Sequence, residues 1–174
     1  RIKPRDKVWD SIYSGTLRNI KRHFLSYDLN NVCYLTGGHK YGDKHKEVYD
    51  DLHKNQTNQF TLVNQKLDRH HMPIFYNLSK VGLCLSKAEG AMYSSMEYLL
   101  CGLPIVSTKS IGGRDEFFTD KNCIFAKDNS KSVKDCVDKW LNNYPSLKER
   151  YEIREDAIRM QKTHTKVLKN KIKE

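Results

Sequence analysis

Two glutamates eight positions apart are the residues of this sequence with the clearest chemical potential. Glu89 follows a short apolar run that ends at Ser86, and Glu97 lies in a segment with the composition of a helix. A second apolar run, from Leu103 to Val106, comes next. A loop and a helix start between two buried strands can present backbone N–H groups to a phosphate. The same arrangement can present a carboxylate to sugar hydroxyls.

The elements that must position these glutamates alternate between strands and helices. Apolar runs predict strands at 8–15, 32–36, 60–63, 81–86, 105–107 and 123–126. Helices are predicted at 17–27, 45–54, 73–78, 93–101, 133–140 and 151–169. This alternation implies right-handed crossovers and a parallel sheet with helices on both faces. We therefore expect one α/β domain of Rossmann-like, three-layer form, with strands and motifs over 7–128 and a helical region over 130–174.

Unusual polar and glycine residues gather directly after the predicted strands. The segments concerned are 15–22, 36–38, 64–66, 87–90 and 109–113. Ligands of open α/β sheets bind outside the carboxyl ends of the strands, where all of these segments would meet. The sequence therefore predicts a single binding site at that edge of the sheet.

The string from Phe75 through Thr108 carries a resemblance to a known family. It contains Glu, seven residues, Glu and then Gly-x-Pro-x-Val, and a glycine pair followed by Arg-Asp-Glu comes next at 112–116. In order and spacing this block resembles the donor-binding half of a retaining GT-B glycosyltransferase of the family 4, or group 1, type. The resemblance is most specific over 72–127 and extends from 7 to 128.

The resemblance implies roles for both glutamates. Glu97 would accept hydrogen bonds from the two ribose hydroxyls of a nucleotide donor, as charged acceptors do well. Glu89 would contact hydroxyls of the transferred sugar. An exposed helix carboxylate for Glu97, and a helix-capping carboxylate for Glu89, are the alternatives. The segment that would bind the diphosphate or the sugar comprises Gly90, Ala91, Met92, Tyr93 and Ser94.

The loop after the first predicted strand is expected to supply cations. Gly15 and Lys21 keep the spacing of the resembling family, whereas Thr16 takes the place of its arginine. Fixed cations stabilise the negative charge that develops on a leaving nucleoside diphosphate. Lys21 is our first choice for this role, Arg18 the second and Arg22 the third. The alternative is that these cations form the solvated face of an amphipathic helix.

Four further positions are assigned expected roles. Gly37 and Gln65, which come after the second and third strands, are expected to complete the nucleotide site, with the segment around Gln65 contacting the base. Gly102 is expected to end a helix in the left-handed conformation. Glu116 is interpreted first as a helix-start residue.

The net charge and the cysteines indicate which partners and which cellular compartment to expect. The net charge is +10, from 31 Lys and Arg against 21 Asp and Glu, but no nucleic-acid-binding motif accompanies it. A solvated lysine-rich surface is one interpretation, and attraction to an anionic donor or membrane surface is the other. Scattered cysteines favour buried thiols in a reducing compartment, and no apolar run is long enough to span a bilayer. We therefore expect a cytoplasmic protein, with peripheral membrane contact as an option.

The resemblance also implies what lies outside this sequence. The first residue is Arg1, and the family has an acceptor-binding lobe in front, so we expect that N-terminal lobe to be missing here. The prediction is a donor-binding lobe of a retaining hexosyltransferase that uses a UDP- or GDP-linked sugar and needs no metal or cofactor. A glycan, lipid or protein acceptor would be held by the other lobe, and the isolated piece would be weakly active or inactive. A nucleotide-sugar epimerase and a non-enzymatic RNA- or membrane-binding domain are the alternatives.

Overall fold

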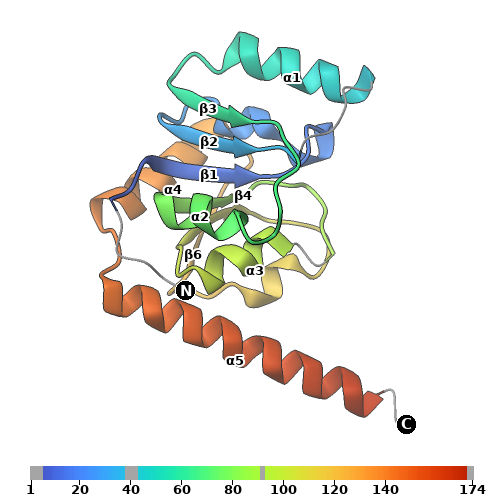
Figure 1. Cartoon of the computed structure of the whole chain (residues 1–174), viewed down its shortest axis with the longest axis vertical. Helices are drawn as coiled ribbons and strands as arrows, with labels where there is room; N and C mark the ends of the chain where they lie inside the picture. The colour runs from blue at the N-terminus through green and yellow to red at the C-terminus, as the bar shows by residue number, and fades with distance from the viewer. Residues whose placement is uncertain (1–5, 38–42, 91–92, 172–174) are drawn as a thin grey trace.

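Six parallel strands form one sheet in the part of the chain that the computed structural model describes, residues 6–37, 43–90 and 93–171 (Figure 1). Each neighbouring pair in the order β3-β2-β1-β4-β5-β6 is parallel, which confirms the predicted sheet. The strands are β1 (Trp9–Ser14), β2 (Val32–Leu35), β3 (Phe60–Val63), β4 (Ser79–Cys84), β5 (Ile105–Thr108) and β6 (Cys123–Ala126).

The strand order reverses between β1 and β4. From β1 the chain adds β2 and β3 on one side, and from β4 it adds β5 and β6 on the other. The loops that leave two neighbouring strands in opposite directions open a crevice between them, and open α/β sheets bind ligands at this switch point. The segments that follow β1 and β4 contain Lys21 and Glu89, respectively.

Helices cover both faces of the sheet, as predicted (Figure 1). On one face lie α1 (Asp43–Asn55), the 3-10 turn η2 (His23–Ser26) and α4 (Ser130–Asn142). On the other face lie α2 (Met72–Leu78) and α3 (Tyr93–Leu100), and α5 (Leu147–Lys171) packs on α3.

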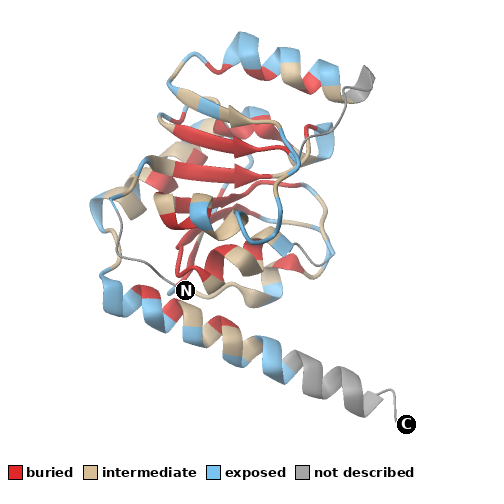
Figure 2. Ribbon diagram, in the orientation of Figure 1, coloured by how far each residue is buried: buried red, intermediate tan, exposed pale blue. Residues whose placement is uncertain are grey.

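A hydrophobic core lies on each side of the sheet. Leu52 and Val133 belong to the cluster under α1 and α4, and Leu99 and Ile153 belong to the cluster under α3 and α5. Figure 2 shows the central strands buried between the two helical layers. Strands buried on both faces need continuous apolar sequence, which is why their runs are readable. Among the described helices, none is long and apolar enough to cross a lipid bilayer.

The cysteines are buried free thiols, as predicted. Burial raises the pKa of both Cys33 and Cys84 to about 12, so these thiols stay protonated at neutral pH. A thiol must ionise to act as a nucleophile or a metal ligand, so the two groups serve as packing residues.

Several helix ends follow local sequence signals. Gly102 has a φ of 66°, and the N–H of Leu103 bonds to the carbonyl of Tyr98 at 3.0 Å. This is the left-handed helix end predicted for Gly102. Pro73 lies in the first turn of α2, and the side chain of Asn129 caps α4 by accepting from the N–H of Ser132 at 2.8 Å.

The helix predicted over 17–27 does not form. Two 3-10 turns occupy this segment, η1 (Asn19–Lys21) and η2, and Arg22 between them has a φ of 54°. The guanidinium of Arg22 bonds to the carbonyl of Leu85 at 2.7 Å and to the hydroxyl of Thr108 at 2.6 Å. These buried contacts with distant strands override the helical periodicity of the segment.

Candidate functional site

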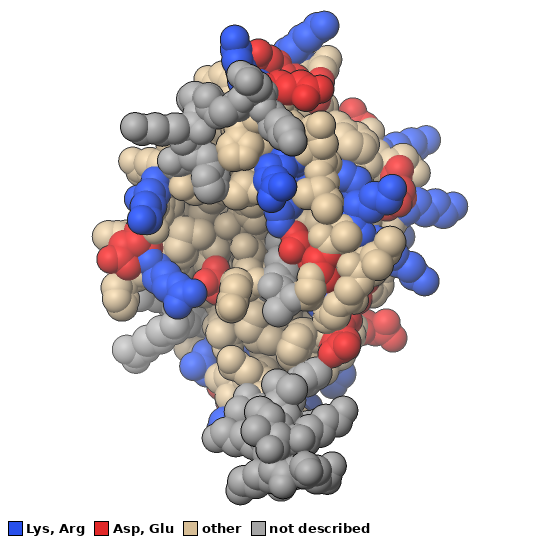
Figure 3. All heavy atoms as spheres, turned by 90° about the vertical axis from the view of Figure 1, so that its right-hand side faces the viewer, with Lys and Arg blue, Asp and Glu red and all other residues tan. Residues whose placement is uncertain are grey.

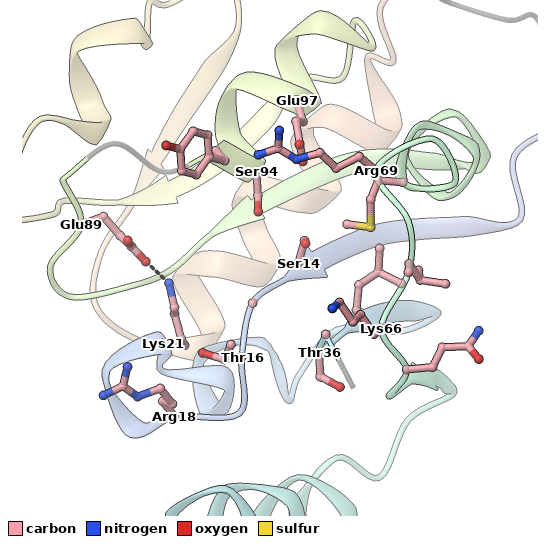
Figure 4. Close-up of a pocket in the computed structure, with 17 residues that line it drawn as sticks. Ser14, Thr16, Arg18, Lys21, Thr36, Lys66, Arg69, Glu89, Ser94 and Glu97 are labelled. Atoms are coloured by element: carbon pink, nitrogen blue, oxygen red, sulfur yellow. Dashed lines mark hydrogen bonds and ion pairs between the residues drawn. The ribbon is translucent and has the colours of Figure 1, made fainter. Parts of the chain in front are cut away.

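A cleft of about 500 Å³ opens at the carboxyl ends of the strands. Figure 3 looks onto this edge and shows acidic and basic side chains around a hollow in the surface. The walls come from the segments after β1, β2 and β3, from the loop after β4 and from α3 (Figure 4). The lining residues are Ser14, Gly15, Thr16, Arg18, Lys21, Leu35, Thr36, Gly37, Gln65, Lys66, Leu67, Arg69, Met72, Glu89, Tyr93, Ser94 and Glu97.

Lys21 and Glu89 form an ion pair across the switch point (Figure 4). Their side chains are only 18% and 16% exposed, respectively. The backbone of Lys21 is held in place by a buried residue, because the hydroxyl of Tyr13 donates a hydrogen bond to the carbonyl oxygen of Lys21. The pair therefore presents one ammonium and one carboxylate, fixed side by side, to a ligand in the cleft. The alternative, in which Lys21 lies on the solvated face of an amphipathic helix, does not hold, because its segment forms a 3-10 turn and its ammonium is paired with Glu89.

Glu97 is fixed by a buried phenol. The hydroxyl of Tyr76 donates to Oε2 of Glu97 at 2.8 Å. The ring of Tyr76 meets the edge of Tyr98 at 5.0 Å between centroids, and the Tyr98 hydroxyl accepts from the N–H of Ser14 at 2.7 Å. Burial raises the pKa of Tyr76, and the charge on Glu97 raises it further, so the phenol remains a hydrogen-bond donor. Glu97 is thus a positioned acceptor at the cleft wall.

The structure brings most of the predicted site residues together. Arg18, with an exposed side chain, lines the cleft from the same loop as Lys21. Gly90 is exposed and does not line the cleft, and Ala91 and Met92 lie outside the described residues. The other predicted residues that line the cleft are Gly15, Gly37, Gln65, Tyr93 and Ser94.

Arg22 is placed differently from the prediction. It is 8% exposed, and its guanidinium bonds to the carbonyl of Leu85 and the hydroxyl of Thr108. It does not belong to the cleft lining, so it is not a third cation for a phosphate. Its charge is instead paired with Asp128, at 3.0 Å.

Two residues of the cleft carried no signal in the sequence. Arg69 lines the cleft from the long connection between β3 and α2, and Met72 lines it from the first position of α2. The rule that ligands meet the carboxyl ends of strands identifies residues close to a strand end, such as Lys66. The same rule does not identify Arg69, because this residue lies six residues beyond Val63, the last residue of β3.

The chemistry of the cleft is that of anion and hydroxyl binding. Its cations are Arg18, Lys21, Lys66 and Arg69, and its carboxylates are Glu89 and Glu97. Among the described residues, no three His, Cys, Asp or Glu side chains lie close enough to hold a metal ion. The cations suit a diphosphate, and the carboxylates suit sugar hydroxyls.

The sequence profile of the family described as Glycosyl transferases group 1 matches residues 17–160 of the chain. No curated protein sequence matches the chain significantly.

Solved structures share the fold at low sequence identity. A glycosyltransferase from Rickettsia africae matches with a TM-score of 0.72 and 13% identity over 96% of this chain and 48% of that one. The C-terminal domain of LpcC, a glycosyl transferase group 1 family protein from Francisella tularensis, matches with a TM-score of 0.64 and 18% identity over 91% of this chain and 86% of that one. Anabaena HepE in complex with UDP matches with a TM-score of 0.65 and 15% identity over 94% of this chain and 49% of that one. The chain thus spans about half the length of two of these three proteins.

Proposed function

The chain belongs to the group 1 glycosyl transferases, and we propose that it is the lobe of such an enzyme that binds the nucleotide-sugar donor. The membership confirms the resemblance seen in the sequence, and the Rossmann-like parallel sheet is the fold expected for the C-terminal lobe of a GT-B enzyme. One observation carries the proposal: the cleft at the switch point holds Lys21, Glu89 and Glu97 together. The UDP complex of HepE, a protein of the same fold, supports it.

Each of the three residues has a role in this proposal. Glu97, fixed by Tyr76, accepts hydrogen bonds from the two ribose hydroxyls. Lys21 binds the diphosphate, and Glu89 beside it contacts hydroxyls of the sugar. During transfer the bond between the anomeric carbon and the diphosphate oxygen breaks, the acceptor oxygen bonds to the same carbon, and the proton of the acceptor hydroxyl passes to the departing diphosphate. Lys21 stabilises the negative charge that develops on the departing diphosphate.

The finer features of the reaction belong to the same proposal. Transfer retains the configuration of the anomeric carbon and needs no metal, as the family resemblance implies. The donor is UDP- or GDP-linked, and we test UDP first because HepE is known in complexes with UDP and with UDP-glucose. A second lobe, outside this sequence, holds the acceptor, which is a glycan, a lipid or a protein.

A calorimetric panel of UDP, GDP, ADP and their sugar conjugates, in EDTA, tests the proposal. We expect the wild-type chain to bind one nucleotide family. The change Glu97→Ala should lower that affinity about 10- to 100-fold, because a hydrogen bond to a charged group contributes roughly 1.5–3 kcal/mol. Glu152→Ala, which removes an exposed carboxylate from α5, is the matched control and should bind as the wild type does.

Four outcomes would contradict the proposal or one of its parts. A folded chain that binds none of the nucleotides has no donor site of the kind described, and equal binding by Glu97→Ala would remove Glu97 from it. Conversion of a free nucleotide sugar without an acceptor would indicate an epimerase instead. Steeply salt-dependent RNA binding without nucleotide-sugar binding would indicate a basic RNA-binding domain.

A further inference from the structure

Two arginines are buried beside the loops that follow β1, β4 and β5. Arg22 is 8% exposed and Arg114 is fully buried, and neither lines the cleft. Arginine is almost never buried unless its charge is paired and its N–H groups are bonded. Burial of each guanidinium therefore carries a large desolvation cost, which its hydrogen bonds and its ion pair must offset.

The first of these arginines, Arg22, connects the loop after β1 to the residue that follows β4 and to β5. Nε of Arg22 donates to the carbonyl of Leu85 at 2.7 Å, and one Nη donates to the hydroxyl of Thr108 at 2.6 Å. The other Nη pairs with Asp128 at 3.0 Å. Arg22 is also the residue that follows Lys21 in the chain, so these bonds fix the end of the loop that carries the cleft ammonium.

The second arginine, Arg114, connects the loop after β5 to the segment directly after β4 and to β5 itself. One Nη of Arg114 donates to the carbonyl of Ser86 at 3.2 Å, which is the next carbonyl after the one that Arg22 uses. The other Nη donates to the hydroxyl of Ser107 at 2.9 Å and to the carbonyl of Thr108. Nε pairs with Asp115 at 2.9 Å. The two guanidinium groups thus meet at Thr108, the last residue of β5.

Backbone hydrogen bonds extend this junction to Glu89. The N–H of Lys87 donates to the carbonyl of Ile20 at 3.0 Å, and the N–H of Ile111 donates to the carbonyl of Lys87 at 3.0 Å. The N–H of Glu89 donates to the carbonyl of Ile111 at 3.0 Å. At Gly112 the backbone lies so close that a Cβ there would be 2.0 Å from the carbonyl oxygen of Glu89. The three loops after β1, β4 and β5 therefore form one connected layer, and the arginines anchor it to the sheet.

We propose that Arg22 and Arg114 are positioning residues, which hold Lys21 and Glu89 at the spacing that a sugar diphosphate requires. The inference rests on the proposed function for its ligand, but the anchoring of the loops stands on its own. The planar guanidinium bonds several acceptors at fixed angles, whereas a lysine ammonium is a flexible point charge. A displacement of about 1 Å at a reacting centre can cost on the order of a hundredfold in rate, so anchoring of this kind matters to function.

Charge-conserving variants separate positioning from charge. We expect Arg22→Lys and Arg114→Lys to lower the affinity for UDP-glucose about tenfold and to leave the affinity for uridine unchanged, because Glu97 lies outside the anchored loops. A GDP-linked sugar and guanosine replace these probes if the panel selects GDP. Calorimetry measures the diphosphate, and saturation-transfer NMR measures the nucleoside. Thr108→Val, which removes only the hydroxyl that accepts from Arg22, should give a smaller loss of the same kind and serves if Arg22→Lys does not fold.

Arg150→Lys is the matched control. Arg150 is 4% exposed and donates to the carbonyls of Gly102 at 3.1 Å and Cys101 at 3.3 Å, at the opposite edge of the sheet. Its variant should lose thermal stability as the other two do, yet bind UDP-glucose like the wild type. If the lysine variants keep full affinity for UDP-glucose, or if UDP-glucose and uridine weaken equally in them, the positioning role is overturned.

Amide hydrogen exchange tests the anchoring without any ligand. Arg114→Lys should accelerate exchange at the bonded amides of Glu89 and Ile111, and leave exchange in β2 unchanged. If the wild type binds no nucleotide but this local acceleration occurs, the proposed function falls while the anchoring stands. Unchanged exchange at both amides would overturn the inference itself.

Discussion

Lys21 and Glu89 contact each other inside the cleft, and this contact decides how either can meet a ligand. The two side chains are paired at 18% and 16% exposure, so solvent screens their interaction only in part. A diphosphate and the Glu89 carboxylate therefore compete for the same ammonium. A carboxylate beside a binding site for an anion also repels that anion directly.

Opposite effects are expected from the two halves of this pair. Glu89→Gln should raise the affinity for UDP about fivefold, because it removes a competitor and a repulsive charge, which together contribute about 1 kcal/mol. Lys21→Gln should lower the same affinity by at least that factor. The gain should be smaller for UDP-glucose than for UDP, since Glu89 is proposed to contact the sugar. Calorimetry on the three proteins measures this, and weaker UDP binding by Glu89→Gln would contradict the competition.

At the scale of elements, the close approach of α3 to β4 places Glu97 in the cleft. Gly82 in β4 lies directly under Tyr98, and a Cβ at that position would be 2.4 Å from Cδ2 of the tyrosine ring. Tyr98 in turn bonds to the N–H of Ser14 and packs on Tyr76, which orients Glu97. The absence of a side chain at one strand position thus sets the height of the helix above the sheet.

Gly82→Ala should therefore destabilise the protein. Because the tyrosine ring is fully buried and its hydroxyl is bonded to the N–H of Ser14, we expect the free energy of unfolding to fall by roughly 1–3 kcal/mol. Urea unfolding followed by circular dichroism measures this. Gly90→Ala is the control, since a Cβ there would meet no atom within 4 Å, and its stability should match the wild type. Equal stability of Gly82→Ala would mean that α3 can shift without cost.

At the scale of the whole molecule, a buried histidine links stability to pH. His23 is 1% exposed and packs against the rings of Tyr13 at 4.7 Å and Tyr34 at 6.0 Å. Burial, aided by the charge on Lys21, lowers the pKa of His23 from 6.5 to about 4 and outweighs the opposing contact with the Gly15 carbonyl. The folded protein therefore keeps this ring neutral under conditions in which the unfolded chain protonates it.

The stability of the protein should fall as the pH falls from 6.5 to about 4. In this window the unfolded state binds a proton that the folded state does not, so the free energy of unfolding decreases with decreasing pH. His23→Phe keeps an aromatic ring at the site and should remove this part of the pH dependence, on the order of 3 kcal/mol across the window. Urea unfolding at pH 7 and pH 4.5 compares the two proteins. His70→Phe, at an exposed position, should keep the wild-type slope, and an unchanged slope in His23→Phe would place the titration elsewhere.

The class of fold and the edge of the sheet at which the cleft lies were both predictable from the sequence alone. Strands of a parallel sheet are buried on both faces, so their apolar runs are continuous and locally readable. The loops that follow such strands must converge on one edge, which is why Gly15, Gly37 and Gln65 could be grouped with Glu89 and Glu97. The turn at Gly102 was also predictable, because the conformation it needs depends on one residue type.

Which charged residues line the cleft and which are buried away from it depends on tertiary contacts that the sequence pattern does not predict. Arg18, Lys21 and Arg22 look alike in a helical pattern, yet the first is exposed, the second is ion-paired and the third is buried. Arg22 is buried because its guanidinium bonds to acceptors directly after β4 and on β5, more than sixty residues away in the chain. Periodicity records only which local conformation buries apolar surface. It carries no record of the distant carbonyls that make burial of a guanidinium favourable, and those contacts broke the predicted helix at Arg22.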